Sequence, residues 1–136
     1  MRLKNKIAII TGAGSGFGKG IAIRFAEEEA KVVIVDINLD SAEKVAMEIG
    51  KNALAVKCDV SQDGDVASLF EQTLEQFGSA DILVNNAGTT HRNKPMTEVT
   101  EIEFDQIFAV NVKSVFLTAK HGVPLMKKQG QGVILN

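Results

Sequence analysis

Thr11-Gly12-Ala13-Gly14-Ser15-Gly16-Phe17-Gly18 is the stretch of this chain that decides its fold. It follows an apolar run, Ile7 to Ile10, and stands at the start of a predicted helix. Glycines let a backbone turn sharply and approach a diphosphate, and the helix that follows offers free N–H groups to phosphate oxygens. The turn therefore predicts dinucleotide binding, with a purely structural turn as the alternative. The expected contact residues are Gly12, Ser15, Gly16, Phe17 and Gly18.

Asp36 ends the second apolar run, 18 residues after Gly18. An acid at about this distance, roughly 20 residues, accepts hydrogen bonds from the ribose hydroxyls of a bound dinucleotide. Its charge would repel a 2′-phosphate, and neither Ile37 nor Asn38 brings a cation that could offset this repulsion. The sequence therefore favours NAD over NADP. The alternative is a solvated acid that merely ends a strand.

Further runs of apolar residues follow at regular intervals, and they do not alternate with polar residues. Such runs are typical of strands covered on both faces, as in a parallel sheet. Segments with helical spacing lie between them, so the order β-α-β-α-β-α-β-α-β predicts an open, doubly wound α/β sheet. No linker divides the chain, and we expect one domain over residues 1–136. The five predicted strands are Ile7 to Ile10, Val32 to Val35, Ala53 to Val56, Ile82 to Val84 and Val133 to Leu135.

Helix ends are marked by capping signals. Asp40 with Glu43, and Thr100 with Glu103, have the spacing of an N-cap residue and its partner in a capping box. Gly78 stands where a helix commonly ends in a left-handed glycine. These signals predict helices that begin at about residues 40 and 100, and one that ends at residue 78.

Composition excludes several classes of protein. Hydrophobic residues make up 45% of the 136 residues and charged residues 24%, which argues against disorder. The formal net charge of −2 makes nucleic acid an improbable main partner, and no apolar run approaches the ~18 residues of a membrane span. Cys58 is the single cysteine, which fits a reducing, cytoplasmic setting. No cluster of His, Cys, Asp or Glu has metal-ligand spacing, so we expect no metal.

The sequence resembles the short-chain dehydrogenase/reductase family. Thr11, Gly12, Gly16 and Gly18 fit that family's Thr-Gly-x-x-x-Gly-x-Gly turn, and three further motifs follow in order along the whole chain. The resemblance implies a Rossmann fold and an NAD-dependent oxidoreductase. Such an enzyme transfers hydride between the nicotinamide and a small carbonyl or alcohol substrate.

The three downstream motifs carry residue roles by resemblance. Asp59 and Val60 correspond to the pair beside the adenine ring, and the stretch Asn86-Ala87-Gly88 passes beside the cofactor. Asn111 corresponds to the helix asparagine of the family's catalytic group, thought to hold a kinked helix and a water. The residues alone leave an alternative in each case. Asp59 is then a helix-cap or loop acid near Ser61, the asparagine–glycine stretch is a plain turn, and Asn111 lies on a solvated stripe of its helix.

The catalytic tyrosine of the family is not found in this sequence, which contains no Tyr at all. Members of the family carry a Ser after the fifth strand and then Tyr-x-x-x-Lys on the next helix, whereas this chain stops at Asn136. The resemblance therefore implies the amino-terminal half of an enzyme, incomplete on the C-terminal side of the sheet and inactive alone. Two alternatives remain open, a non-catalytic NAD-binding module and an interaction fragment. The residues present identify neither the substrate nor the direction of reaction.

The segment 101–126 is apolar on more than one stripe, with Phe104, Phe108 and Phe116 among its apolar residues. One sheet face cannot cover all of these side chains. We therefore expect a partner helix, and the resemblance implies a homo-oligomer through this segment; contact with a missing part of the same chain is the alternative. Pro124 should kink or end the segment because it removes a backbone hydrogen bond.

Overall fold

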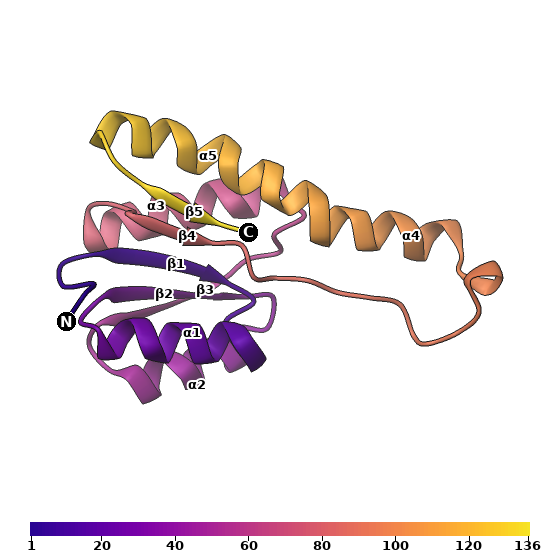
Figure 1. Cartoon of the computed structure of the whole chain (residues 1–136), viewed down its shortest axis with the longest axis horizontal. Helices are drawn as coiled ribbons and strands as arrows, with labels where there is room; N and C mark the ends of the chain where they lie inside the picture. Colours follow the sequence, from indigo (N-terminus) through magenta and orange to yellow (C-terminus); the bar gives the residue numbers. More distant parts are fainter.

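The structure is a computed structural model that describes all residues, 1–136, and it has the predicted alternation of strands and helices (Figure 1). All five predicted strands are confirmed, with ends that differ from the prediction by one residue at most. The elements are β1 (Ile7–Thr11), α1 (Gly16–Glu27), β2 (Lys31–Asp36), α2 (Leu39–Ile49), β3 (Ala53–Lys57), α3 (Asp63–Phe77), β4 (Ile82–Val84), the 3-10 helix η1 (Met96–Glu98), α4 (Glu101–Phe108), the π-helix η2 (Ala109–Lys113), α5 (Ser114–Gln129) and β5 (Val133–Leu135).

The strands form one parallel sheet in the order β3-β2-β1-β4-β5. β1 lies in the middle, where Ile9 pairs with Val33 of β2 on one side and with Leu83 of β4 on the other. Along the chain, β2 and β3 are added on one side of β1, and β4 and β5 are then added on the other side. This confirms the doubly wound Rossmann topology and places its switch point between β1 and β4, where open α/β sheets bind ligands.

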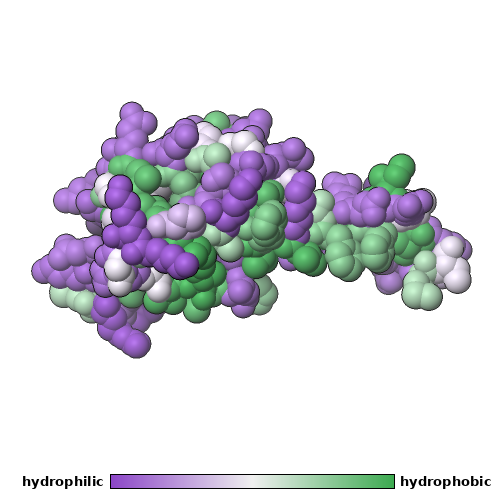
Figure 2. Space-filling view, turned by 90° about the horizontal axis from the view of Figure 1, so that it is seen from above, coloured by the Kyte–Doolittle hydropathy of each residue, from purple (hydrophilic) through white to green (hydrophobic).

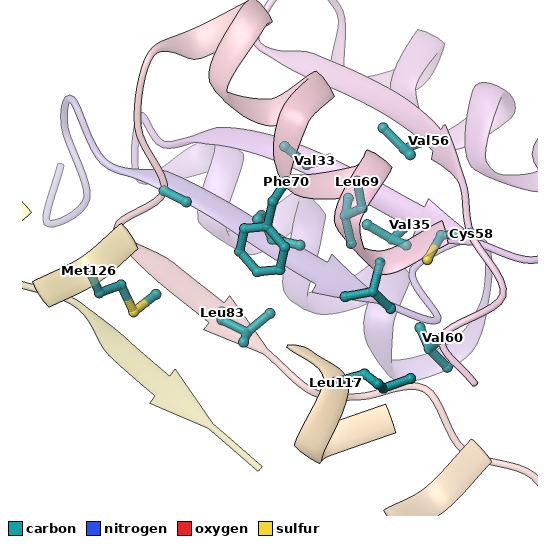
Figure 3. Packing of buried hydrophobic residues seen from close by; sticks show 13 residues of the cluster. Val33, Val35, Val56, Cys58, Val60, Leu69, Phe70, Leu83, Leu117 and Met126 are labelled. Carbon is teal, nitrogen blue, oxygen red and sulfur yellow. The ribbon is translucent and has the colours of Figure 1, made fainter. Parts of the chain in front are cut away.

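Two hydrophobic cores cover the two faces of the sheet. Ile9, Val33 and Leu83 belong to the core under α3 and α5, which Figure 3 shows around Phe70. Their sequence neighbours, such as Ile10 and Ile34, belong to the core under α1 and α2. Because successive side chains of a strand point to opposite faces, both sets must be apolar when both faces are covered. This is why the strands read as unbroken apolar runs.

The helix ends follow the capping signals in two of three cases. Thr100 and Glu103 form the predicted capping box, and Gly78 ends α3 in the left-handed conformation. The prediction for Asp40 is wrong, because α2 begins at Leu39 and Asn38 is its N-cap, accepting from the Ser41 amide. Asparagine caps a helix as well as aspartate does, and Asn38 comes first. Asp40 lies instead in the first turn, where its charge favours the helix dipole.

The segment 101–126 is a succession of α4, η2 and α5 that extends to Gln129. Pro124 lies inside α5, so the helix does not end there as one form of the prediction had it. The proline removes one backbone hydrogen bond. Leu117 before it and Met126 after it are both buried in the core, so both parts of the helix are held against the sheet. In Figure 1, α4 projects beyond the sheet. None of the helices combines the length and the apolar character that crossing a membrane would require.

Candidate functional site

A cleft of about 390 Å³ lies at the carboxyl ends of the strands, around the switch point between β1 and β4. Residues that follow β1, β2, β3 and β4 line it, and α4 and η2 contribute from the other side. Eight of the predicted site residues come together here: Gly12, Ser15, Asp36, Asp59, Val60, Asn86, Ala87 and Gly88. Segments far apart in the sequence thus meet at the place where a doubly wound sheet takes a ligand.

The ends of β1 and β4 are tied together by Thr11 and Asn86. The Thr11 hydroxyl is buried and accepts hydrogen bonds from the backbone amides of Asn86 and Ala87, both at 3.0 Å. The Asn86 side-chain amide donates to the carbonyl oxygens of Thr11 at 2.9 Å and Gly12 at 3.2 Å. Asn86 therefore supports the glycine-rich turn with its side chain and lines the cleft as well.

Close packing against these groups explains two of the glycines. Gly12 has a φ of +63°, and a Cβ there would lie 2.9 Å from the Ala87 Cα. A Cβ on Gly18 would lie 2.5 Å from the Asn86 side-chain nitrogen. Gly18 does not line the cleft, so its direct role is to let α1 approach β1 and β4.

The remaining predicted residues of the turn lie at the start of α1. Ser15 is the N-cap of α1, and its side chain makes no capping bond, so the hydroxyl is available to the cleft. Gly16 and Phe17 are in the first turn and do not line the cleft, and the Phe17 side chain is 90% exposed. Their contribution to a ligand would be made through the backbone N–H groups that a helix leaves free at its start.

Asp36 is held in place by two backbone amides. One carboxylate oxygen accepts from the Gly14 amide at 2.9 Å, and the other accepts from the Asn38 amide at 3.0 Å. Asp36 thus both ends its strand and lines the cleft, so the two interpretations of this residue are compatible. The cleft lining contains the carboxylates of Asp36 and Asp59 and no Lys or Arg.

Asp59 makes the local bonds that the alternative interpretation expected. One of its carboxylate oxygens accepts from the Ser61 amide at 3.0 Å and from the Ser61 hydroxyl at 2.7 Å. Its backbone amide donates to Asp65 at the start of α3. These bonds position Asp59 and Val60 at the cleft, where they lie on the β3 side of Asp36.

Asn111 lies in the π-helix and does not line the cleft. Its side-chain oxygen accepts from the Thr89 amide and its side-chain nitrogen donates to the Thr89 carbonyl, both at 2.8 Å. Thr89 does line the cleft, immediately after the asparagine–glycine stretch. Asn111 is therefore exposed yet fully engaged, and it fixes the strand-end loop to the helix that crosses the cleft.

Five residues of the cleft were missed as ligand contacts: Ile37, Cys58, Thr89, Gln106 and Val110. The first three directly follow or precede predicted site residues, so extending each motif by one position would have found them. Val110 likewise directly precedes a predicted site residue, Asn111, whereas nothing in the sequence signals Gln106, which reaches the cleft only because α4 folds back over it. Burial raises the pKa of the Cys58 thiol to about 12, helped by the nearby carboxylates of Asp65 and Asp59. Cys58 therefore lines the site as a neutral thiol, in keeping with an inert role.

Each histidine has one polar partner, and neither histidine lines the cleft. The His91 Nδ1 lies 2.6 Å from the Arg92 carbonyl oxygen, and the His121 Nε2 lies 2.9 Å from a carboxylate oxygen of Asp63. No group of three or more His, Cys, Asp or Glu side chains is gathered into a potential metal site. The polar groups at the cleft are backbone amides, carboxylates, amide side chains and the hydroxyls of Ser15 and Thr89.

Comparison with known proteins gives consistent results. A family model described as short chain dehydrogenase matches residues 6–136. A 4-formylbenzenesulfonate dehydrogenase of Comamonas testosteroni is 44% identical over 139 aligned residues, which cover 100% of this chain and 55% of the relative. An uncharacterized oxidoreductase of Thermotoga maritima is 43% identical, with coverage of 100% and 54%. The chain thus spans about half the length of the curated relatives it matches.

A solved structure agrees with these relatives in fold. The crystal structure of a 3-ketoacyl-(acyl-carrier-protein) reductase from Brucella melitensis, complexed with NADH, superposes with a TM-score of 0.96 at 51% sequence identity. The match covers 98% of this chain and 57% of that one. The fold of this chain therefore has a counterpart of known architecture.

Proposed function

The chain belongs to the short-chain dehydrogenase family, and from that premise we propose that it forms the NAD(H)-binding part of an oxidoreductase. When bound, the nicotinamide would supply or accept a hydride, at a carbonyl or alcohol carbon of a small substrate. The Brucella melitensis relative is a ketoacyl reductase in complex with NADH, and the Comamonas testosteroni relative is a dehydrogenase of a formyl compound. Both names support a substrate of the carbonyl or alcohol class.

The observation that carries the proposal is the position of Asp36 next to the glycine-rich turn in one cleft. Gly12 and the free amides at the start of α1 would bind the diphosphate, with Ser15 adding a hydroxyl. Asp36 would accept hydrogen bonds from the adenosine ribose, since two backbone amides already orient its carboxylate. Asp59 and Val60 would flank the adenine on the β3 side.

The other end of the cofactor would pass toward β4. Asn86, Ala87 and Gly88 line this part of the cleft, and Thr89 continues the lining toward α4. Asn111 would position Thr89 and so keep this end open for the nicotinamide. We assign Asn111 to the catalytic group by family resemblance. Its hydrogen bonds to Thr89 support a role in positioning the loop.

Affinity for the two nicotinamide cofactors tests the proposal. We expect Asp36→Asn to weaken NADH binding by roughly 1–3 kcal/mol, because the charge of a half-buried, hydrogen-bonded group is lost. The same change should improve NADPH relative to NADH, because the repulsion of the 2′-phosphate is removed. Fluorescence titration of both cofactors gives the ratio of their affinities, which a partial loss of folding leaves unaffected.

Asp40→Asn is the matched control, because Asp40 is an exposed acid in the first turn of α2 and does not line the cleft. It should leave both affinities unchanged. If the ratio of NADH affinity to NADPH affinity is the same in Asp36→Asn as in the wild type, the assigned role of this carboxylate is refuted.

A second function, NAD binding without catalysis, is favoured by one observation. The chain contains no Tyr, so a tyrosine acid or base cannot act within it. We expect the 136-residue chain to bind NADH and to show no reduction of carbonyl compounds by NADH. Measurable turnover by the purified chain would contradict this account of the proton transfer.

We further propose that the chain associates through α4, η2 and α5. Exposed apolar side chains on these helices and in β5 have no cover in the monomer. They include Ile102, Phe104, Phe108, Val112, Phe116, Val133 and Leu135. Green, apolar surface is visible on the projecting part of the molecule in Figure 2. A second copy of the chain is the occupant that the family resemblance implies, with a continuation of the same polypeptide as the alternative.

A further inference from the structure

A second, smaller cavity of about 200 Å³ adjoins the cleft. Loop residues 89–92 line one side of this cavity, and Glu103, Gln106 and Ile107 of α4 line the other. Thr89 and Gln106 line both the cleft and this cavity, so the two spaces are neighbours. A complete ligand pocket usually measures about 300–1,000 Å³, so this cavity suits one substituent of a molecule lodged partly in the cleft.

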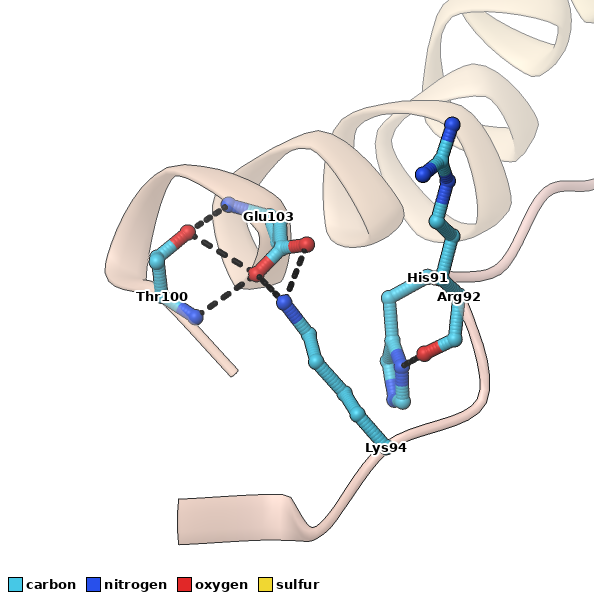
Figure 4. Close-up of polar contacts among 5 residues, drawn as sticks. All are labelled: His91, Arg92, Lys94, Thr100 and Glu103. Atoms are coloured by element: carbon cyan, nitrogen blue, oxygen red, sulfur yellow. Dashed lines mark hydrogen bonds and ion pairs between the residues drawn. The ribbon is translucent and has the colours of Figure 1, made fainter. Parts of the chain in front are cut away.

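The charges around this cavity leave one cation free. Both carboxylate oxygens of Glu103 accept from the Lys94 ammonium at 2.7 Å, and one of them also accepts from Thr100, as Figure 4 shows. This pair neutralises Glu103 and occupies Lys94. His91 is engaged through its Nδ1 with the backbone carbonyl of Arg92.

Arg92 makes no hydrogen bond or ion pair through its guanidinium. In Figure 4 the Arg92 side chain points away from the Lys94–Glu103 pair. A guanidinium presents several N–H donors in one plane and binds carboxylates and related oxyanions with paired hydrogen bonds. Arg92 is one of the residues that line the cavity, and its exposed side chain has no partner in the chain that would compete with a ligand.

The place of the cavity along the cleft indicates which ligand this is. Asp36 stands after β2 and Thr89 after β4, on opposite sides of the central strand β1. If Asp36 binds the adenosine ribose, as the proposed function has it, the opposite end of the cofactor lies toward Thr89. The reacting carbon of the substrate must lie beside that end, and the cavity is next to it.

We propose that Arg92 recognises an anionic oxygen group, of the carboxylate class, on the substrate of this protein. This inference rests on the proposed function for the identity of the ligand as substrate. The cavity holds the anionic group, and the rest of the molecule extends past Thr89 and Gln106 into the cleft. Substrates that carry such a group are preferred over uncharged molecules of the same shape.

Benzoate and benzamide are matched probes, since they share a ring and differ in the charge of one substituent. We expect benzoate to shift the backbone amide resonances of residues 89–92 in a ¹⁵N-labelled chain, and benzamide to shift them far less. Arg92→Gln should weaken benzoate binding by roughly tenfold, whereas Arg92→Lys should restore part of it. Lys128→Gln is the control, because Lys128 is an exposed, unpaired cation near the end of α5.

The titrations are run with and without NADH so that the two proposals fail separately. If the wild-type chain binds benzoate but not NADH, the proposed function is refuted and the Arg92 site is still supported. Benzoate binding that Arg92→Gln does not change, benzamide binding of equal strength, or no benzoate binding at all would each overturn the Arg92 proposal.

Discussion

Gly18 and Gly20 are two residues apart on α1, and their surroundings differ. A Cβ on Gly18 would collide with the side chain of Asn86 and with the backbone of Ala13, whereas a Cβ on Gly20 would meet no atom within 4 Å. Gly18 is therefore required for the close approach of α1 to the strand ends. No contact in the structure requires a glycine at position 20.

Substituting these two glycines separates crowding from helix propensity. Gly18→Ala should destabilise the chain by roughly 1–3 kcal/mol through overpacking, and should weaken NADH binding because the turn is displaced. Gly20→Ala should be neutral or stabilise it by up to about 1 kcal/mol, since alanine favours a helix interior. Urea unfolding gives the stabilities and fluorescence titration the affinities. Equal effects of the two changes would show that the packing around Gly18 has been misjudged.

Asp36 and Asp59 show how a residue meets two requirements. Each lines the cleft, and each also bonds to neighbouring groups of its own loop. A pattern in the sequence could name both acids as candidates. It could not show that their local bonds and their exposure to the cleft exist together, because that depends on how the loops pack.

At the scale of elements, α4 and the loop before it are held by a small network. Glu103 caps α4 together with Thr100 and accepts from Lys94 of the loop, while Asn111 of η2 bonds to Thr89 at the start of that loop. The hydrogen bonds from Lys94 and Thr100 lower the pKa of Glu103 from its ordinary value of 4.5 to about 2. The charged carboxylate is therefore the form that the folded chain favours.

The pH dependence of unfolding follows from this shift. A carboxyl whose pKa is lower in the folded chain stabilises it above about pH 4.5, and this stabilisation disappears as the pH falls toward about 2. Glu103→Gln should flatten this part of the curve of stability against pH, measured by urea unfolding between these limits. Glu101→Gln is the control, as an exposed acid of the same turn with no ion pair. A curve that Glu103→Gln leaves as steep as before would rule out the network as its source.

At the scale of the whole molecule, the two edges of the sheet differ in burial: β3 and β5 are both edge strands, and β3 is the more deeply buried of the two. β5 has one neighbour, β4, and Val133 and Leu135 remain about half exposed. α5 leads directly into β5 (Figure 1), and α4, η2 and α5 also carry exposed apolar side chains, among them Phe104, Val112 and Phe116. Exposed apolar area of this kind promotes association.

We expect the chain to self-associate as its concentration rises, and Phe116→Glu to weaken this by roughly tenfold or more, because a charge would be buried without a partner. Phe116 is suitable because it is 63% exposed, so the change should not disturb the core. Lys127→Glu, on an exposed site of α5, is the control. Sedimentation velocity over a range of concentrations measures the effect. A chain that stays monomeric throughout would contradict the proposed interface.

Local sequence was sufficient for the strands, their parallel arrangement and most of the cleft. Apolar runs reveal strands covered on both faces, and the residues just beyond them must meet at the carboxyl edge of a parallel sheet. Gly12, Asp36 and Asn86 could therefore be placed together from their position after successive strands. Each of these inferences needs only a few adjacent residues.

Long-range packing was needed for the rest. Gln106 and Val110 reach the cleft because α4 and η2 lie over it, and Asn111 finds its partner in Thr89, 22 residues earlier in the chain. The π-helix, and the continuation of α5 beyond Pro124, likewise depend on what these helices pack against. Contacts between distant residues are chosen by the packing energy of whole elements, and no short stretch of sequence contains that energy.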